Sequence, residues 1–242
     1  MLLTTSIAGQ AIAQQPAHKE SLSEEVTNPI AFLMKFAVEN QYSPSLWNSR
    51  GEGNVVQGDA VIPFEAFARQ NLARIRIFFD TSTPEGNRGL SQSQVVDLVL
   101  FQRGWGTFGA GVTAQLTATT FDRHGAVAPG PAFGAVAQRG KWQYGVFNQN
   151  FFSDNVAETQ LQPILAYEFN EKWSAEIGDV QYVYDWKKGR VTSIPLSAQL
   201  NRILLRDKES VQLSFQAQYN LKNIPGQTMW TLTAGVTLIP KQ

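Results

Sequence analysis

Strict alternation of apolar and polar residues is clearest near the C-terminus of the chain. From Val211 to Asn220 every second residue is apolar, and the residues between are Gln, Ser or Asn. From Trp230 to Leu238 apolar residues alternate with Thr and Gly. Such a period of two indicates β-strands with one apolar and one polar face. The polar face carries compact, uncharged side chains rather than Lys and Glu, which predicts a polar lumen with the apolar face turned to lipid.

The same alternation recurs through most of the chain and predicts ten further strands. They are expected near residues 32–39, 55–67, 74–79, 96–100, 112–117, 132–138, 142–151, 160–169, 173–186 and 193–201. The expected fold is therefore all-β, a transmembrane antiparallel up-and-down β-barrel of about 12 strands. A short N-terminal periplasmic segment is expected to precede it.

The connections between these strands alternate in length. Long polar loops are expected near 42–54, 81–89, 120–130, 151–158, 185–190 and 220–228, and short turns near 69–71, 102–105, 139–141, 170–172 and 206–208. Bacterial outer-membrane barrels combine an even strand number with short periplasmic turns and longer external loops. The pattern thus predicts an integral outer-membrane location in a Gram-negative-type envelope, with both termini periplasmic.

Charged residues at inward positions are the candidate functional residues of the barrel. In the fourth strand Val96, Leu98 and Leu100 are expected to face outward and Asp97 inward. Charges on neighbouring strands could form a constriction that selects solutes, or an ion-pair network that fills the lumen. A barrel of twelve strands is intermediate in diameter between small barrels filled by side chains and large ones with an open channel, so both interpretations stay open. The expected lumen-facing cluster is Lys35, Glu39, Asp59, Arg74, Arg76 and Asp97.

Three strands do not give a clear facing. The sixth and seventh carry many small or ambiguous residues. The ninth, Trp173 to Trp186, changes phase around Gly178 and Asp179, which predicts a β-bulge there.

The N-terminal region divides into a signal-like part and a polar leader. Residues 1–13 are modestly apolar and end in Ala11-Ile12-Ala13, a small-x-small pattern typical of signal cleavage, although a basic n-region is missing. Residues 14–29 form the expected periplasmic leader, in which Ser21 and Glu24 have the spacing of a helix-capping box. Either one short helix or an irregular leader fits this segment. The barrel itself is expected over 30–242.

Composition excludes several other classes of protein. Lys+Arg and Asp+Glu both number 20, so the balanced net charge gives no basic surface for nucleic acid. Cysteine is absent, which excludes disulfides and thiolate metal sites. The sequence contains no run of about 18 apolar residues, the length that a membrane-spanning helix needs. A chain that spans a membrane by strands must then close into a barrel, because an open edge would leave unpaired amides in lipid.

Several short motifs resemble those of a known family. They occur in the same order and are spread over nearly the whole chain after residue 28. They are Asn28-Pro29-Ile30-Ala31, Val61-Ile62-Pro63-Phe64, Trp142-Gln143-Tyr144-Gly145, residues 161–169 (LQPILAYEF), Ile194-Pro195-Leu196, residues 213–220 (LSFQAQYN) and Ile239-Pro240-Lys241. With these motifs the chain resembles a family of bacterial outer-membrane barrels, predicted transporters linked by name to phenol-degradation pathways and often mislabelled "neuromedin U".

The resemblance implies an outer-membrane location and passage of small solutes, hydrophobic or aromatic ones included. It supplies no catalytic residues. One departure concerns the C-terminus: outer-membrane barrels usually end in an aromatic residue that the insertion machinery reads, whereas this chain ends Pro240-Lys241-Gln242.

Enzymatic chemistry finds little support in the sequence. The two histidines are His18 in the leader and His124 in a loop, and no serine follows His124 closely. A hydrolase would need a base oriented beside its nucleophile, so no catalytic, cofactor-binding or metal site is predicted. The expected function is a passive channel or transporter for small solutes. The alternative is a non-conducting structural or partner-binding barrel. Expected partners are membrane lipids, the outer-membrane insertion machinery and a small solute, with a monomer favoured and nucleic acid excluded.

Overall fold

The computed structural model describes residues 21–84, 86, 88–116, 126–205 and 209–241. No helix within these residues is long and apolar enough to cross a membrane. The elements, in chain order, are α1 (Leu22–Thr27), β1 (Lys35–Leu46), β2 (Gly53–Ala66), β3 (Arg69–Ser82), β4 (Gly89–Arg103), β5 (Gly106–Leu116), β6 (Val127–Arg139), β7 (Trp142–Phe152), β8 (Ala157–Asn170), β9 (Trp173–Glu176), β10 (Tyr182–Asp185), β11 (Arg190–Ser193), β12 (Pro195–Leu205), β13 (Glu209–Asn220) and β14 (Thr228–Pro240).

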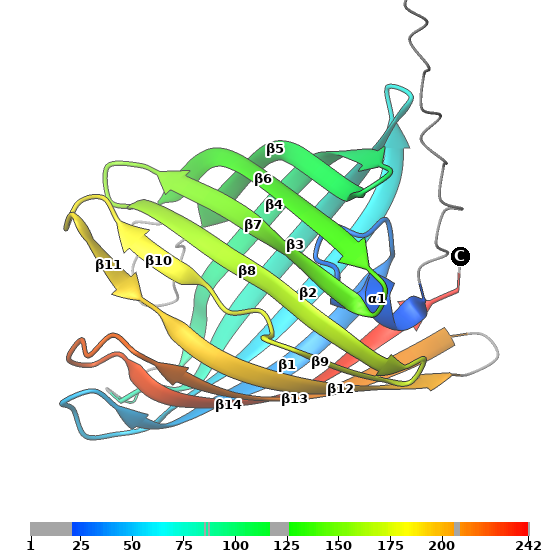
Figure 1. The fold of residues 1–242 in the computed structure, drawn as a ribbon. Coiled ribbons are helices and arrows are strands. Elements are labelled where there is room, and N and C mark those ends of the chain that lie inside the picture. The colour runs from blue at the N-terminus through cyan, green and yellow to red at the C-terminus, as the bar shows by residue number, and fades with distance from the viewer. Residues whose placement is uncertain (1–20, 85, 87, 117–125, 206–208, 242) are drawn as a thin grey trace, which may run out of the picture.

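The strands form one closed antiparallel barrel (Figure 1). Consecutive strands pair from β1 to β8, β14 pairs with both β13 and β1, and β9 closes the ring between β8 and β12. Within the described residues, β9 and β10 are two halves of one interrupted wall strand, and so are β11 and β12. The fourteen segments therefore make twelve wall strands, as predicted. We call β9 with β10 the ninth wall strand and β11 with β12 the tenth.

The predicted orientation of side chains, toward the lumen or toward the outside, is confirmed for most of the wall. In the last hairpin Gln212, Gln216 and Thr233 are buried on the luminal side, whereas Phe215 and Val236 are exposed on the outer side. The facing of β6 and β7, which the sequence left unsettled, places Val136 and Phe147 in the core of the barrel. An apolar exterior around a hydrogen-bonded ladder is the arrangement that a bilayer requires.

Short turns gather at one end of the barrel and long loops at the other. The tight turns include Gly104–Trp105 and Gly140–Lys141. The turn between β2 and β3 is Phe67–Ala68, where both residues have positive φ, slightly before the predicted 69–71. The predicted turn at 206–208 lies outside the described residues. Helix α1 lies at the short-turn end (Figure 1), which we call the helix end; the opposite end is the loop end.

The N-terminal residues fill the helix end of the barrel. Helix α1 has the predicted capping box, because Ser21 accepts from the Glu24 amide and Glu24 accepts from the Ser21 amide. The chain then continues inside the barrel, where Ile30 is fully buried. Strand one therefore begins at Lys35 rather than at the predicted Phe32, since residues 28–34 pack against the inner wall. We call residues 22–34 the plug.

The plug explains a wrong prediction for β4. Val96, Leu98 and Leu100 were expected outside, yet all three are buried inside and belong to the cluster that contains Ile30. Asp97 consequently lies on the outer face and is exposed. The apolar-out rule fails here because the apolar plug fills this part of the lumen, so the inner wall that packs against it must be apolar too.

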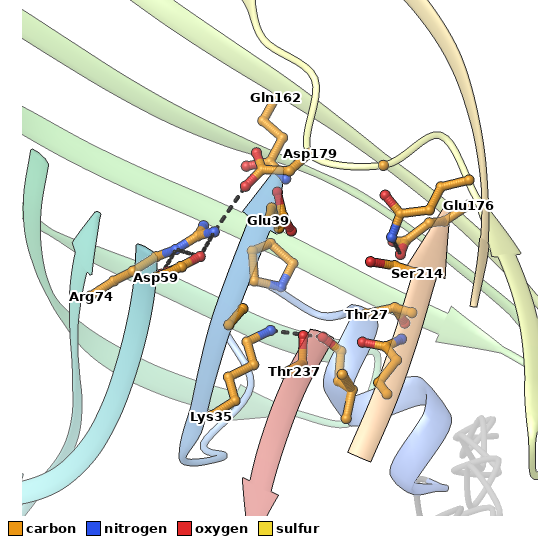
Figure 2. Close-up of a pocket in the computed structure, with 16 residues that line it drawn as sticks. Thr27, Lys35, Glu39, Asp59, Arg74, Gln162, Glu176, Asp179, Ser214 and Thr237 are labelled. Atoms are coloured by element: carbon orange, nitrogen blue, oxygen red, sulfur yellow. Dashed lines mark hydrogen bonds and ion pairs between the residues drawn. The ribbon is translucent and has the colours of Figure 1, made fainter. Parts of the chain in front are cut away.

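The predicted bulge in strand nine is a larger interruption. Its ladder stops at Glu176 and resumes at Tyr182, and residues 177–181 leave the wall. These residues fold into the barrel, where Figure 2 shows Asp179 among the luminal side chains. We call residues 177–181 the inward segment.

Candidate luminal site

Five of the six predicted cluster residues meet inside the barrel. Lys35 and Glu39 come from β1, Asp59 from β2 and Arg74 from β3 (Figure 2). Arg76 comes from β3 as well. Each strand presents alternate residues inward, so positions two apart on one strand and opposite positions on its neighbour share a face. Register confirms this, because Asp59 lies directly opposite Arg76. The sixth residue, Asp97, does not join the cluster for the reason given above.

Asp59 and the two arginines form a buried ion-pair network. Arg74 Nε donates to both carboxylate oxygens of Asp59, at 3.1 and 3.0 Å, and Arg76 Nε lies 3.8 Å from Asp59 Oδ2. Arg74 and Arg76 are only 6 and 4% exposed. Buried guanidinium groups need paired carboxylates, because desolvation of an uncompensated charge costs several kcal/mol, on the order of 3–5.

The second carboxylate of this network is Asp179, which the sequence did not single out. Arg74 Nη2 donates to Asp179 Oδ2 at 2.8 Å, and Arg76 Nη2 donates to the same oxygen. The only sequence signal for Asp179 was the change of phase at Gly178, which could have placed it on either face. A broken strand leaves the direction of its residues to tertiary contacts.

Glu176 is a second luminal carboxylate that sequence reasoning missed. Its Oε1 accepts from Gln199 Nε2 at 2.8 Å and from Asn201 Nδ2 at 2.6 Å, both on the adjacent β12. Lys35 Nζ instead donates to the carbonyl of Val26 in the plug, at 2.7 Å. The cluster is thus joined to the plug on one side and to the inward segment on the other.

A polar cavity of about 80 Å³ lies at this cluster, lined by residues of the plug, the inward segment and the wall. That volume holds several water molecules, since one needs about 10–15 Å³ of such space. Among the described residues, Arg74 Nη1, Arg76 Nε and Asp179 Oδ1 have no hydrogen-bond partner. The cavity has room for water or a small polar solute beside Arg74 and Asp179, whereas these three atoms are themselves buried without a partner.

Hydrogen bonds hold the plug to the wall on the side of β7 and β8. Gln143 donates to the Glu24 carbonyl and accepts from the Thr27 hydroxyl, both at 3.1 Å, and Ser21 donates to Glu168 at 3.0 Å. On its other side the helix borders a more apolar pocket of about 450 Å³ at the helix end, lined by Leu22, Leu33 and Ile239 among others. The plug therefore separates the polar cavity from this outer pocket.

Comparison with known proteins identifies the fold. No family model matches the chain, and no curated protein matches it in sequence. Among solved structures, the COG4313 outer membrane channel from Pseudomonas putida F1 is similar at TM-score 0.56 and 11% identity, over 88% of this chain and 98% of that one. Outer membrane phospholipase A from Escherichia coli is similar at TM-score 0.48 and 12% identity, over 86% and 92%.

Sequence identities this low show the fold alone. The Pseudomonas protein is a β-barrel of the bacterial outer membrane. This chain has that fold.

Proposed function

We propose that the protein is an integral outer-membrane channel that lets small solutes pass by diffusion. The observation that carries this proposal is the charged cavity inside a closed barrel. Lys35, Arg74 and Arg76 face four carboxylates there, so this part of the lumen offers both signs of charge. Rings of charged side chains of this kind select solutes in many pores.

The likeness to an outer-membrane channel supports the same proposal. The apolar exterior supports an outer-membrane location, in which the helix end and both termini face the periplasm. We further propose a monomer without enzymatic activity. Small hydrophobic or aromatic solutes remain the proposed substrates, on the basis of the motif resemblance.

A non-conducting barrel is the second candidate, and a specific observation favours it. The plug packs Ile30 against apolar inner-wall residues of several strands, and the ion-pair network bridges much of the remaining lumen. A structural barrel filled in this way would be stable without carrying any solute.

Conductance of the full chain in a planar bilayer separates the two. A channel gives discrete current steps whose size rises with salt concentration. Heat-dependent gel mobility of the same sample shows whether the barrel is folded. A folded sample that stays silent over long recordings would reject the channel and leave the structural barrel.

A further inference from the structure

We propose that the inward segment, residues 177–181, is the gate of the lumen, which Asp179 holds shut by pairing with the opposite wall. This inference rests on the proposed channel function and adds a moving part to it. The closed form is the one described here. In the open form the segment would lie in the barrel wall between β8 and β12.

The closing contact crosses the full width of the barrel. Asp179 belongs to the ninth wall strand and pairs with Arg74 and Arg76 on the third, six positions away in a ring of twelve. Figure 2 shows the Asp179 carboxylate meeting Arg74 in the lumen. A contact between opposite walls must pass through the solute path, so the segment obstructs that path for as long as the ion pair lasts.

Few hydrogen bonds other than those of Asp179 hold the segment inside, where Val180 is buried. No ladder pair joins residues 177–181 to β8 or β12. The Ile177 amide donates to the Leu165 carbonyl at 3.1 Å, and the Ser197 hydroxyl donates to the Ile177 carbonyl. The Val180 amide bonds only within the segment, to the Gly178 carbonyl at 3.0 Å. Segments with few wall hydrogen bonds open at low free-energy cost, which is a requirement for a gate.

The strand register shows that the segment fits the wall. On β8 the ladder reaches Ala166 opposite Glu176 and resumes at Leu161 opposite Tyr182, so four residues of β8 face five of the segment. On the tenth wall strand the ladder reaches Gln199 opposite Glu176 and resumes at Ser193 opposite Val183, so five residues there face six. On each side the ninth wall strand has one residue more than its neighbour, and one β-bulge accommodates one extra residue.

The side chains of the segment also suit a place in the wall. Glu176 faces the lumen and Tyr182 is paired with the outward-facing Leu161. With one bulge at Gly178 and Asp179, alternation between these two points turns Ile177 and Val180 toward lipid. It turns Gly178, Asp179 and Gln181 toward the lumen. Apolar side chains outside and polar ones inside is the pattern of a membrane-barrel strand.

Two prolines border the gap and weaken the in-wall state. On β8 the amide of Glu168 donates toward β7, whereas the Leu165 carbonyl faces the ninth wall strand. Antiparallel strands alternate these directions residue by residue, so Pro163 directs its missing N–H to the gap. On the tenth wall strand the Ile203 amide donates to the Lys172 carbonyl, toward the ninth wall strand. Pro195 is an even number of residues from Ile203, so the side on which its N–H is missing also faces the gap. In the wall, the segment would find two donors fewer than an ordinary strand.

Gly178 gives a test of the gate that leaves charge unchanged. Its φ is +69°, and a Cβ added there would lie 2.4 Å from Gln216 Oε1 and 2.8 Å from Gln199 Oε1. Gly178→Val therefore disfavours the inward fold, while valine suits a strand. We expect this variant to raise the open-to-closed ratio in single-channel recordings at least about tenfold, the effect of ~1.4 kcal/mol.

Asp179→Asn tests the ion pair itself. It keeps the size of the side chain but removes its charge, and we expect the open-to-closed ratio to rise by a similar factor. Glu176→Gln is the matched control, because it neutralises a neighbouring luminal carboxylate that the structure pairs with amides rather than with arginine. Open probability should change little in the control. Equal behaviour of the two variants would show that luminal charge alone matters, and would overturn the gate.

The deciding experiment locks the segment in place. The chain has no native cysteine, so Asp179→Cys with Arg76→Cys provides two unique thiols for a short, reducible bifunctional cross-linker. We expect bridging, confirmed by mass, to abolish the current, and reductant to restore it. A bridged channel that conducts as before overturns the gate but leaves the channel function intact. Because a gate visits both states, prolonged exposure to the cross-linker should trap the segment inside; a pair that never bridges under these conditions would show that the segment does not return to the lumen, and also overturns the gate. Silence of the full chain and of every variant, all folded, overturns both proposals.

Discussion

At the scale of single residues, one carboxylate balances two buried cations. Asp59 accepts two hydrogen bonds from Arg74 and lies within ion-pair distance of Arg76. All three side chains are at most one-tenth exposed. Removing the shared carboxylate leaves two guanidinium groups with only Asp179 between them.

We therefore expect Asp59→Ala to lower the free energy of unfolding by about 3–5 kcal/mol, the usual effect of breaking a buried pair from one side. Urea titration of the protein in lipid vesicles measures this. Asp80→Ala, at the loop end of the neighbouring β3, is the control and should cost far less. A loss under ~1 kcal/mol at Asp59 would mean that water in the cavity already solvates the arginines.

At Asp97, unlike at Asp59, removing the carboxylate is expected to raise the free energy of unfolding. Its carboxylate lies on the outer face of β4, the ninth of fifteen residues, opposite Val112 and Ala73 on the neighbouring strands. A charged group on the lipid face near mid-membrane is destabilising, and for a carboxylate the cost is about 1–2 kcal/mol.

Asp97→Val should raise the free energy of unfolding in vesicles by that amount. Val99→Asp, two residues along the same face, should lower it comparably and serves as the mirror control. If Asp97→Val instead destabilises the barrel, Asp97 has a polar partner in the membrane that the isolated chain does not show.

At the scale of elements, the plug closes the helix end. Its apolar residues complete a core made with inner-wall residues from β2 to β8, while its backbone and hydroxyl groups bond to Gln143 and Lys35. The plug is therefore a second obstruction of the lumen besides the inward segment. Residues of both line the same polar cavity.

Ile30→Asp should release the plug, because an ionised carboxylate cannot be accommodated at a fully buried apolar position. We expect a folded barrel with a higher conductance per open channel, without the change in gating expected for Asp179→Asn. Phe36→Ala, on the outer face of β1, is the control. Unchanged conductance in the released variant would show that the solute path bypasses the plug.

At the scale of the whole molecule, the charges of the lumen act together on a passing ion. The described cluster holds Lys35, Arg74 and Arg76 against four carboxylates, so its formal balance is nearly even. Such a lumen should discriminate only weakly between small cations and anions.

Replacing both Arg74 and Arg76 with Ala leaves Lys35 as the one cation that the described cluster retains. The reversal potential in a potassium chloride gradient should then move clearly toward that of potassium. Lys35→Ala alone should give a smaller shift in the same direction. A double variant that keeps the original reversal potential would place the conducting path away from this cluster.

Much of the fold and of the site follows from local pattern. Alternation predicted the barrel, its twelve wall strands and the inward facing of Lys35, Glu39, Asp59, Arg74 and Arg76, because a closed sheet between lipid and lumen sorts side chains with a period of two. Loop lengths predicted which ends of the strands gather together. The spacing of Ser21 and Glu24 allowed a short helix but left an irregular leader open, and the structure has the helix.

Tertiary structure decided what occupies the lumen. The facing of Asp97 depended on the plug, whose packing makes the inner wall apolar where alternation implies water. The position of Asp179 depended on two arginines on the opposite wall, about one hundred residues away in sequence. Periodicity reports only which side of a strand a residue occupies. It carries no information about segments that leave the wall, because their conformation is set by contacts across the barrel.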